Sequence, residues 1–310
     1  MITDNHLSPL IVREKLVKTA TYAALVVAAF LVISKFFAWY ITNSLSIKAS
    51  LVDSLLDAFA SMINFIAVRH ALRPADADHR FGHGKVEALA SLGQALFIAL
   101  SSLWLMHEVV ERLYEPVVIE YNSIAIGVMV FSTILAVLLV LGQRYVIKRT
   151  NSLAISADAL HYQTDILTNL GVLASFGLSS YLNLPYFDTS VGAAIAIYIL
   201  FASWKISKKS FDILMDRELP DETLMTIRHI AQSHPQVLGI HDLRTRSSGH
   251  NEFIQMHLDL EASLTLDEAH HIADDVANQI YATFPTAEVI IHQDPVGRCR
   301  QRFRKQILSQ

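Results

Sequence analysis

Six stretches of the chain before residue 210 are almost wholly apolar, and each is long enough to cross a lipid bilayer, which takes about 20 helical residues. Only the second and third are joined by a longer charged loop, from Arg69 to Lys85. The first stretch is too long, and begins too far along the chain, to be the core of a signal peptide. Six membrane-spanning helices are therefore predicted, near Leu16–Tyr40, Leu45–His70, Val86–Leu113, Ser123–Val146, Leu153–Tyr181 and Thr189–Ser207.

The pattern changes after Asp212, where charged residues become as frequent as in soluble proteins. Helical spacing and polar–apolar alternation predict an α-β-β-α-β order. The elements are a helix from Pro220 to about Ser233, strands at His241–Arg246 and Glu252–Leu260, a helix at Leu266–Phe284 and a strand at Glu288–His292. We therefore expect a helical membrane domain over residues 1–212, a cytoplasmic α+β domain over 213–296, and a basic, disordered tail over 297–310.

Composition supports this division and limits the chemistry. The 310 residues are 52% hydrophobic and 17% charged, whereas soluble domains carry about 25% charged residues. The net charge of −4 gives no reason to expect a nucleic-acid partner. Cys299 is the only cysteine, so a metal site must use histidines and carboxylates. The segment Gly82-His83-Gly84-Lys85-Val86 lacks the glycine spacing and hydroxyl residue of a phosphate-binding loop, so ATP is not expected.

Lysine and arginine gather at one set of loop ends, while the opposite ends hold little more than Lys48 and Arg112. Basic residues favour the cytoplasmic side of a membrane. Both termini are therefore expected in the cytoplasm.

The predicted second and fifth spans carry ionisable side chains deep inside them. Asp53 and Asp57 lie on the second, and His161 and Asp165 on the fifth. A carboxylate at the centre of a bilayer costs at least about 2.5–3.5 kcal/mol. Each pair is spaced i, i+4, so its side chains share one helix face, and zinc favours four ligands of these types. A proton relay without metal, or hydrogen bonding between helices, are the alternatives.

The same two spans begin with similar sequences. Asn43-Ser44-Leu45-Ser46-Ile47 resembles Asn151-Ser152-Leu153-Ala154-Ile155, and with this offset Asp53 meets His161 and Asp57 meets Asp165. The predicted topology makes one span run inward and the other outward. An inverted repeat with a binding site between its halves is a transporter architecture.

Three runs resemble the cation diffusion facilitator family, most closely its bacterial zinc and ferrous-iron efflux antiporters. They are Ser50-Leu51-Val52-Asp53-Ser54-Leu55-Leu56-Asp57, Phe81-Gly82-His83-Gly84-Lys85-Val86-Glu87 and Asp158-Ala159-Leu160-His161-Tyr162-Gln163-Thr164-Asp165. The resemblance implies a homodimer in the bacterial inner membrane, six spans per subunit and a metallochaperone-like cytoplasmic domain. It makes Asp53, Asp57, His161 and Asp165 the transport site, with zinc and cadmium preferred over manganese.

Two further metal sites follow from the resemblance. Asp76, His79 and His83 in the charged loop would bind zinc, although loop residues of this kind are commonly only solvated. A binuclear zinc site at the dimer interface would use five residues, which could otherwise be histidines packed between sheet and helix: His241, His257, His270, His292 and Asp294. A charge interlock between subunits would involve Lys85 and Asp216.

The expected function is efflux of divalent cations in exchange for protons by a secondary transporter rather than an enzyme. Metal binding needs neutral imidazole and ionised carboxylate, so metal and protons compete, and His161 is the expected titrating ligand. Zinc, cadmium and ferrous iron all accept such ligands, so the residues leave the metal open. The alternative is a membrane-anchored zinc sensor that does not transport.

Overall fold

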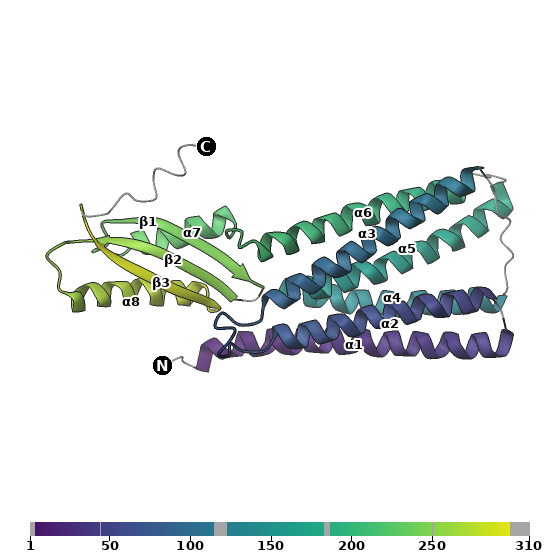
Figure 1. The fold of residues 1–310 in the computed structure, drawn as a ribbon, viewed down its shortest axis with the longest axis horizontal. Helices are drawn as coiled ribbons and strands as arrows, with labels where there is room; N and C mark the ends of the chain where they lie inside the picture. The colour runs from purple at the N-terminus through teal and green to yellow at the C-terminus, as the bar shows by residue number, and fades with distance from the viewer. Residues whose placement is uncertain (1–3, 44, 115–122, 183–186, 250, 298–310) are drawn as a thin grey trace. The chain divides into compact units, whose positions relative to one another are not determined.

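The structure is a computed structural model that describes residues 4–43, 45–114, 123–182, 187–249 and 251–297 (Figure 1). The chain forms two compact units, Met1–Leu214 and Met215–Gln310. Of the predicted tail, residues 298–310 lie outside the described residues.

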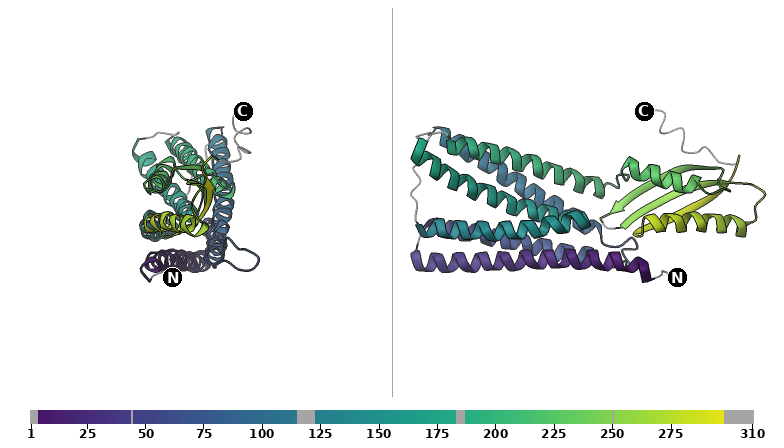
Figure 2. Two further views of the ribbon diagram at one scale, coloured as in Figure 1. Left: turned by 90° about the vertical axis from the view of Figure 1, so that its left-hand side faces the viewer. Right: turned by 180° about the vertical axis from the view of Figure 1, so that it is seen from behind.

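The first unit contains the six predicted helices, which run alongside one another (Figures 1 and 2). The first helix begins at Asp4 and the sixth ends at Leu214, well past their predicted ends, because a helix can continue through charged residues after the apolar stretch stops. The bounds are α1 (Asp4–Thr42), α2 (Leu45–Ala71), α3 (Lys85–Tyr114), α4 (Ser123–Thr150), α5 (Leu153–Leu182) and α6 (Phe187–Leu214).

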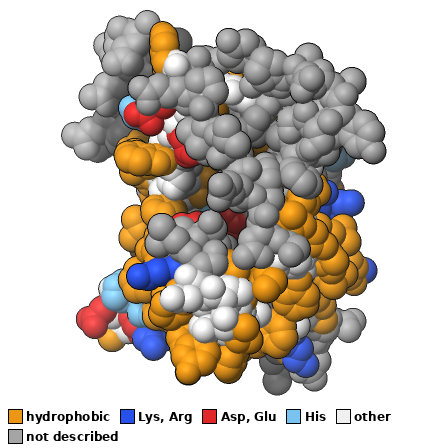
Figure 3. Space-filling model, turned by 90° about the vertical axis from the view of Figure 1, so that its right-hand side faces the viewer, with side chains coloured by type: hydrophobic (Ala, Val, Ile, Leu, Met, Phe, Trp, Pro, Cys, Tyr) orange, Lys and Arg blue, Asp and Glu red, His pale blue; other side chains and the backbone are white. Residues whose placement is uncertain are grey.

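Large apolar side chains cover the outside of this unit. Trp104 is 73% exposed and Phe201 70%, and hydrophobic side chains make up most of the described surface in Figure 3. Contiguous apolar surface of this kind fits a lipid environment. Five of the six helices are apolar and long enough to span a membrane among the described residues, and α5 is the exception.

Helix α5 lies at the centre of the bundle. It contacts each of the other five helices, while α3 pairs with α6 and α1 pairs with α2 and α4. Ala154, Ala157 and Ala159 of α5 are fully buried, and small residues let helices approach closely in a membrane. The buried polar side chains Asp158 and His161 of α5 therefore face protein.

The repeat seen in the sequence has a counterpart in the backbone. Asn43 and Asn151 both have φ of 50°, in the left-handed region that Asn tolerates and that commonly ends a helix. The amide of Asn43 donates to Trp39 O at 2.7 Å, and that of Asn151 donates to Ile147 O at 2.8 Å. The two asparagines thus end α1 and α4 in the same way, ahead of α2 and α5.

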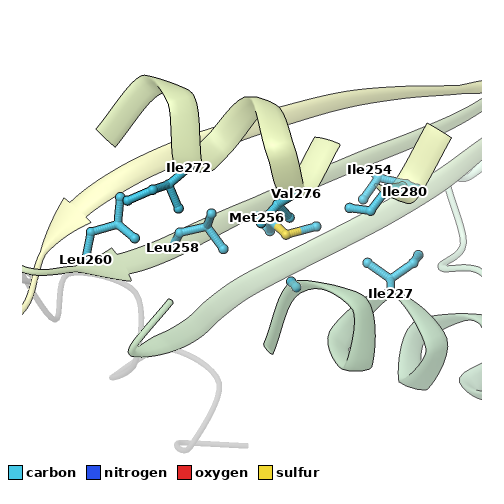
Figure 4. Close-up of a cluster of buried hydrophobic side chains, with 9 residues drawn as sticks. Ile227, Ile254, Met256, Leu258, Leu260, Ile272, Val276 and Ile280 are labelled. Atoms are coloured by element: carbon cyan, nitrogen blue, oxygen red, sulfur yellow. The ribbon is translucent and has the colours of Figure 1, made fainter. Parts of the chain in front are cut away.

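The second unit has the predicted α-β-β-α-β order. Its sheet has the order β1-β2-β3, with β2 antiparallel to β1 and parallel to β3. Alternate residues of β2, Ile254, Met256 and Leu258, pack against the helices (Figure 4). The elements are α7 (Asp221–Gln232), β1 (Gly239–Ser248), β2 (Asn251–Leu260), α8 (Leu266–Thr283) and β3 (Ala287–Pro295).

Candidate metal centres

The first centre lies between α2 and α5. His161 Nε2 and Asp57 Oδ1 are 2.8 Å apart, and Asp57, His161 and Asp165 each offer a ligand atom within 4.8 Å of the others. His161 is 8% exposed. A buried imidazole and two carboxylates converge here, which is a donor set that suits zinc and related cations.

Asp53, the fourth predicted ligand, is not part of this close group. It lies on α2, one turn before Asp57, and is exposed. Its carboxylate interacts electrostatically with that of Asp57. The i, i+4 spacing places both aspartates on one side of α2, so Asp53 lies beside the trio that the other three residues form.

A buried polar network holds α5 next to its neighbours. The Asn64 amide of α2 donates to Ala154 O at 3.2 Å. Asp158, 1% exposed, accepts from Gln143 Nε2 at 2.6 Å and from Ser61 Oγ at 3.4 Å. Because unpaired polar groups are costly away from water, this network fixes the position of the helix that carries His161 and Asp165.

The start of α5 is also anchored, by a buried carboxylate from α3. Glu87 Oε1 accepts from Ser152 Oγ at 2.5 Å and from the Ala154 amide at 3.3 Å. Negative charge is favourable at a helix N-terminus, where amide groups lack partners within the helix. Glu87 therefore ties the first turn of α3 to the first turn of α5.

Sequence reasoning missed Lys35, a cation within α1. Its ammonium donates to Ser54 Oγ at 2.7 Å and to Ser50 O at 3.2 Å, both on α2. Asp53, Asp57 and Asp165 act on it electrostatically. The sequence does contain a sign of it, because Lys35 lies inside a predicted membrane span and an ionisable residue there marks a functional site. Asp158 and Glu87 could have been found in the same way.

The second centre is in the loop between α2 and α3. Asp76 Oδ2 lies 3.3 Å from His83 Nε2, and Asp76 Oδ1 lies 3.3 Å from His79 Nδ1. The ligand atoms of all three residues fall within 4.8 Å of one another. Gly82, with φ of 77°, supplies the left-handed turn that glycine adopts without strain. The loop thus brings together all three predicted residues.

Asp76 is held in its ionised form by the loop backbone. The amides of His79 and Asp78 donate to its Oδ1 at 2.7 and 3.0 Å. The amide of His79 is the largest influence that lowers the pKa of this carboxyl below its ordinary value. An ionised carboxylate is the form that binds a cation.

The third centre is a row of histidines across the sheet of the second unit. His241 of β1 pairs in register with His257 of β2, which pairs with His292 of β3. Their ring centroids are 5.0 and 4.7 Å apart along the row. Side chains alternate between the faces of a strand, so His257 lies opposite the core residues Met256 and Leu258. The histidines therefore lie on the face away from the helices and are not packed between sheet and helix.

Asp294 completes this row. Its Oδ2 lies 2.7 Å from His257 Nδ1 and 3.4 Å from His241 Nε2, and its Oδ1 lies 3.3 Å from His292 Nε2. Burial raises the pKa of this carboxyl, but the hydrogen bond with His257 and the nearby histidines outweigh burial and lower the pKa overall. One carboxylate therefore contacts three imidazoles.

His270 is the predicted member that does not join the row within this chain. It lies exposed on α8 and pairs with Asp274 at 3.5 Å. Helix α8 packs against the opposite face of the sheet through Ile272, Val276 and Ile280. His270 and the row thus lie on opposite sides of one sheet.

Lys85 and Asp216, the residues of the predicted interlock, belong to different units. The Lys85 ammonium donates to Leu214 O at 3.4 Å, which joins the start of α3 to the end of α6. Asp216 Oδ1 pairs with Arg246 Nη1 at 3.3 Å. Each therefore has a role within its own unit.

Comparison with known proteins covers nearly the whole chain. Residues 21–215 match the cation efflux transmembrane domain, and residues 219–296 match the cytoplasmic domain of cation efflux proteins. The cation-efflux pump FieF of Salmonella choleraesuis (strain SC-B67) is 43% identical over 291 residues, which are 94% of this chain and 97% of that protein. FieF of Escherichia coli O1:K1 / APEC is 43% identical over 295 residues, or 95% of this chain and 98% of that protein.

Solved structures match a shorter part. A chain of CzrB in its zinc form is 31% identical and covers 28% of this chain and 99% of its own length, with a TM-score of 0.26. The metal-bound C-terminal domain of the CzcD transporter from Thermotoga maritima is 22% identical and covers 26% of this chain and all of its own, with a TM-score of 0.25. Since both domain matches and 43% identity extend over almost the full length, this chain belongs to the cation efflux (cation diffusion facilitator) family and is a multi-pass membrane transporter that exports divalent metal.

Proposed function

We propose that this transporter exchanges cytoplasmic zinc, and also cadmium or ferrous iron, for protons at Asp53, Asp57, His161 and Asp165. The observation that carries the proposal is the 2.8 Å separation of His161 Nε2 and Asp57 Oδ1. Two ligand atoms this close form a hydrogen bond, so a proton lies between them. A cation bound by both atoms must displace that proton, because metal ligands have to be deprotonated.

The helices that hold the site support alternating access. Asp53 and Asp57 come from α2, whereas His161 and Asp165 come from α5, and these helices follow equivalent asparagine-capped turns. In inverted-repeat transporters a midplane site is exposed alternately to each side as one repeat rocks against the other. We infer that zinc enters from the cytoplasm with both termini on that side, and that protons replace it when the site opens outward.

The loop and the histidine row suit resident zinc ions. Asp76, His79 and His83 supply one carboxylate and two imidazoles, and the row supplies three imidazoles and a shared carboxylate, Asp294. These donors match the nitrogen and oxygen ligands of zinc sites. When bound, such ions would cross-link the segments that hold them.

The row also supports a homodimer, and we propose that this dimer lies in the bacterial inner membrane. His270 cannot reach the row of its own chain, because the sheet lies between them. A second copy of the domain could bring its own α8 to the open face. The binuclear site would therefore gain His270 as its fifth ligand only at an interface between two chains. The interlock of Lys85 with Asp216 of a neighbouring subunit belongs to the same dimer proposal.

The test is zinc flux into liposomes that carry the purified protein and an imposed pH gradient. Inward zinc flux should rise when the interior is acidic. Protons should then move outward, in the direction opposite to zinc. Asp53→Asn should reduce zinc flux if Asp53 joins the trio as a ligand of the bound cation. Zinc binding without any flux would favour a membrane-anchored sensor, and flux that ignored the pH gradient would exclude proton exchange.

A further inference from the structure

A fourth histidine lies against the loop centre. His70 is in the last turn of α2, six positions before Asp76. Its ring meets the ring of His83 with centroids 4.9 Å apart and planes at 88°. Asp76 and His79 are also close enough to act on it electrostatically, as is Arg73. His70 therefore shares the surroundings of the three loop residues.

The ring separations match those of histidines that share one ion. With Zn–N distances of about 2.0–2.1 Å and tetrahedral angles, the centroids of two imidazoles on one zinc lie roughly 5 Å apart. His79 and His83 are separated by 4.5 Å, and His70 and His83 by 4.9 Å. His70 stands just outside the trio whose ligand atoms already converge within 4.8 Å.

The trio leaves one position of a zinc ion open. Structural zinc sites are almost always closed by four protein ligands, whereas three ligands leave a place for water. Asp78, the other acid of this turn, is exposed and donates its amide to Asp76. His70 is half-buried and in contact with His83, which is 7% exposed. Among the described residues, His70 supplies an additional imidazole in contact with this trio.

We propose that His70 is the fourth ligand of the loop zinc site. The inference rests on the proposed binding of zinc by Asp76, His79 and His83, and adds a residue from a helix to three from a loop. With this ligand the ion would connect the end of α2, the helix that carries Asp53 and Asp57, to the start of α3 at Lys85. A closed site of this kind would retain its zinc and would not pass it on.

A second arrangement must be distinguished from ligation. The buried Nδ1 of His83 has no hydrogen-bond partner within the described ranges, and metal-binding histidines usually donate their second ring nitrogen to a neighbour. His70 could serve as that neighbour. In that case it would touch His83 and never the metal, and the ion would carry two imidazoles instead of three.

The experiment isolates the loop site in the full-length protein. Asp57→Ala with His161→Ala removes the transport site, and His257→Ala with Asp294→Ala removes the row. In this background we expect one tightly bound zinc per chain, with three imidazoles by X-ray absorption and a tetrahedral spectrum after cobalt substitution. His70→Ala should leave two imidazoles and weaken zinc binding by more than the roughly 10–100-fold that loss of an outer-shell partner costs. His107→Ala is the control, since His107 pairs with Glu111 at 3.8 Å on α3.

The outcomes separate this inference from the site on which it rests. Loss of zinc on His83→Ala and an unchanged imidazole count on His70→Ala would overturn the role of His70 alone. A count of two both in the background protein and after His70→Ala, with affinity restored by His70→Gln, would assign His70 to the outer shell and also overturn the inference. Failure of the background protein to bind zinc at all would overturn the loop site and this inference with it.

Discussion

His161 and Asp57 form a hydrogen bond of 2.8 Å between two helices, although 104 positions separate them in the chain. The bond joins the two halves of the sequence repeat at the place where each half carries its charges. It also occupies His161 Nε2 and Asp57 Oδ1, the two atoms through which the proposed site would hold a cation. Under the proposed exchange, a divalent ion that binds there would have to break this bond.

Asp57→Asn should abolish zinc transport. The carboxamide keeps the shape of the side chain and can still hydrogen-bond to His161, but it cannot supply the negative charge that balances the cation. Zinc flux in proteoliposomes should fall to that of empty liposomes. Asp275→Asn, a change of the same kind at a side chain that is 67% exposed on α8, should leave flux unchanged. Flux of Asp57→Asn above half of the unmodified rate would contradict the site.

His161→Asp should weaken discrimination against manganese. The change replaces the imidazole nitrogen with a carboxylate oxygen, and oxygen ligands suit manganese and magnesium whereas imidazole suits zinc. Competition between zinc and manganese for uptake measures the ratio of the two rates. We expect this ratio to fall in the variant even if total transport declines, and an unchanged ratio would show that His161 does not set the preference.

Thr265→Ala should destabilise the second unit at one end of α8. The Thr265 hydroxyl accepts from the Glu268 amide, and the Glu268 carboxylate accepts from the Thr265 amide at 2.8 Å. Loss of such a cap costs about 0.5–2 kcal/mol. Hydrogen exchange at the first turns of α8 should become faster. Thr283→Ala, at the other end of the same helix, is the matched control and should have little effect there.

Most helices and strands could be predicted from the sequence because each depends on a local pattern of apolar and polar residues. Hydropathy located the six helices of the first unit, and in the second unit helical spacing located two helices and alternation located three strands. The register of the strands could not be predicted in this way. Only pairing across the sheet brings His241, His257 and His292 into one row, because turns and core contacts align strands that are far apart in sequence. For the same reason the sequence could not separate His270 from that row.

Lys35 was overlooked for a different reason. It is a single charge in an otherwise apolar span, and it has no ionisable partner at i, i+4 to mark a site as the paired residues of α2 and α5 do. His70 lies at the predicted end of the second span, and the spacing of the loop residues does not indicate that the chain turns back towards it. Both residues depend on helix packing, which the pattern of one span does not contain.

Lys35→Met should tighten zinc binding at the transport site and slow release. The ammonium is held by Ser50 O and Ser54 Oγ within electrostatic reach of three carboxylates, so it competes with the cation for the same negative charge. Two charges in a partly buried site interact by some kcal/mol, and we expect zinc affinity to rise on the order of tenfold. Lys35→Arg keeps the charge and should bind zinc with nearly unchanged affinity. Isothermal titration of both variants decides the matter, since weaker or equal binding by Lys35→Met would mean that Lys35 positions α2 and does not act through its charge.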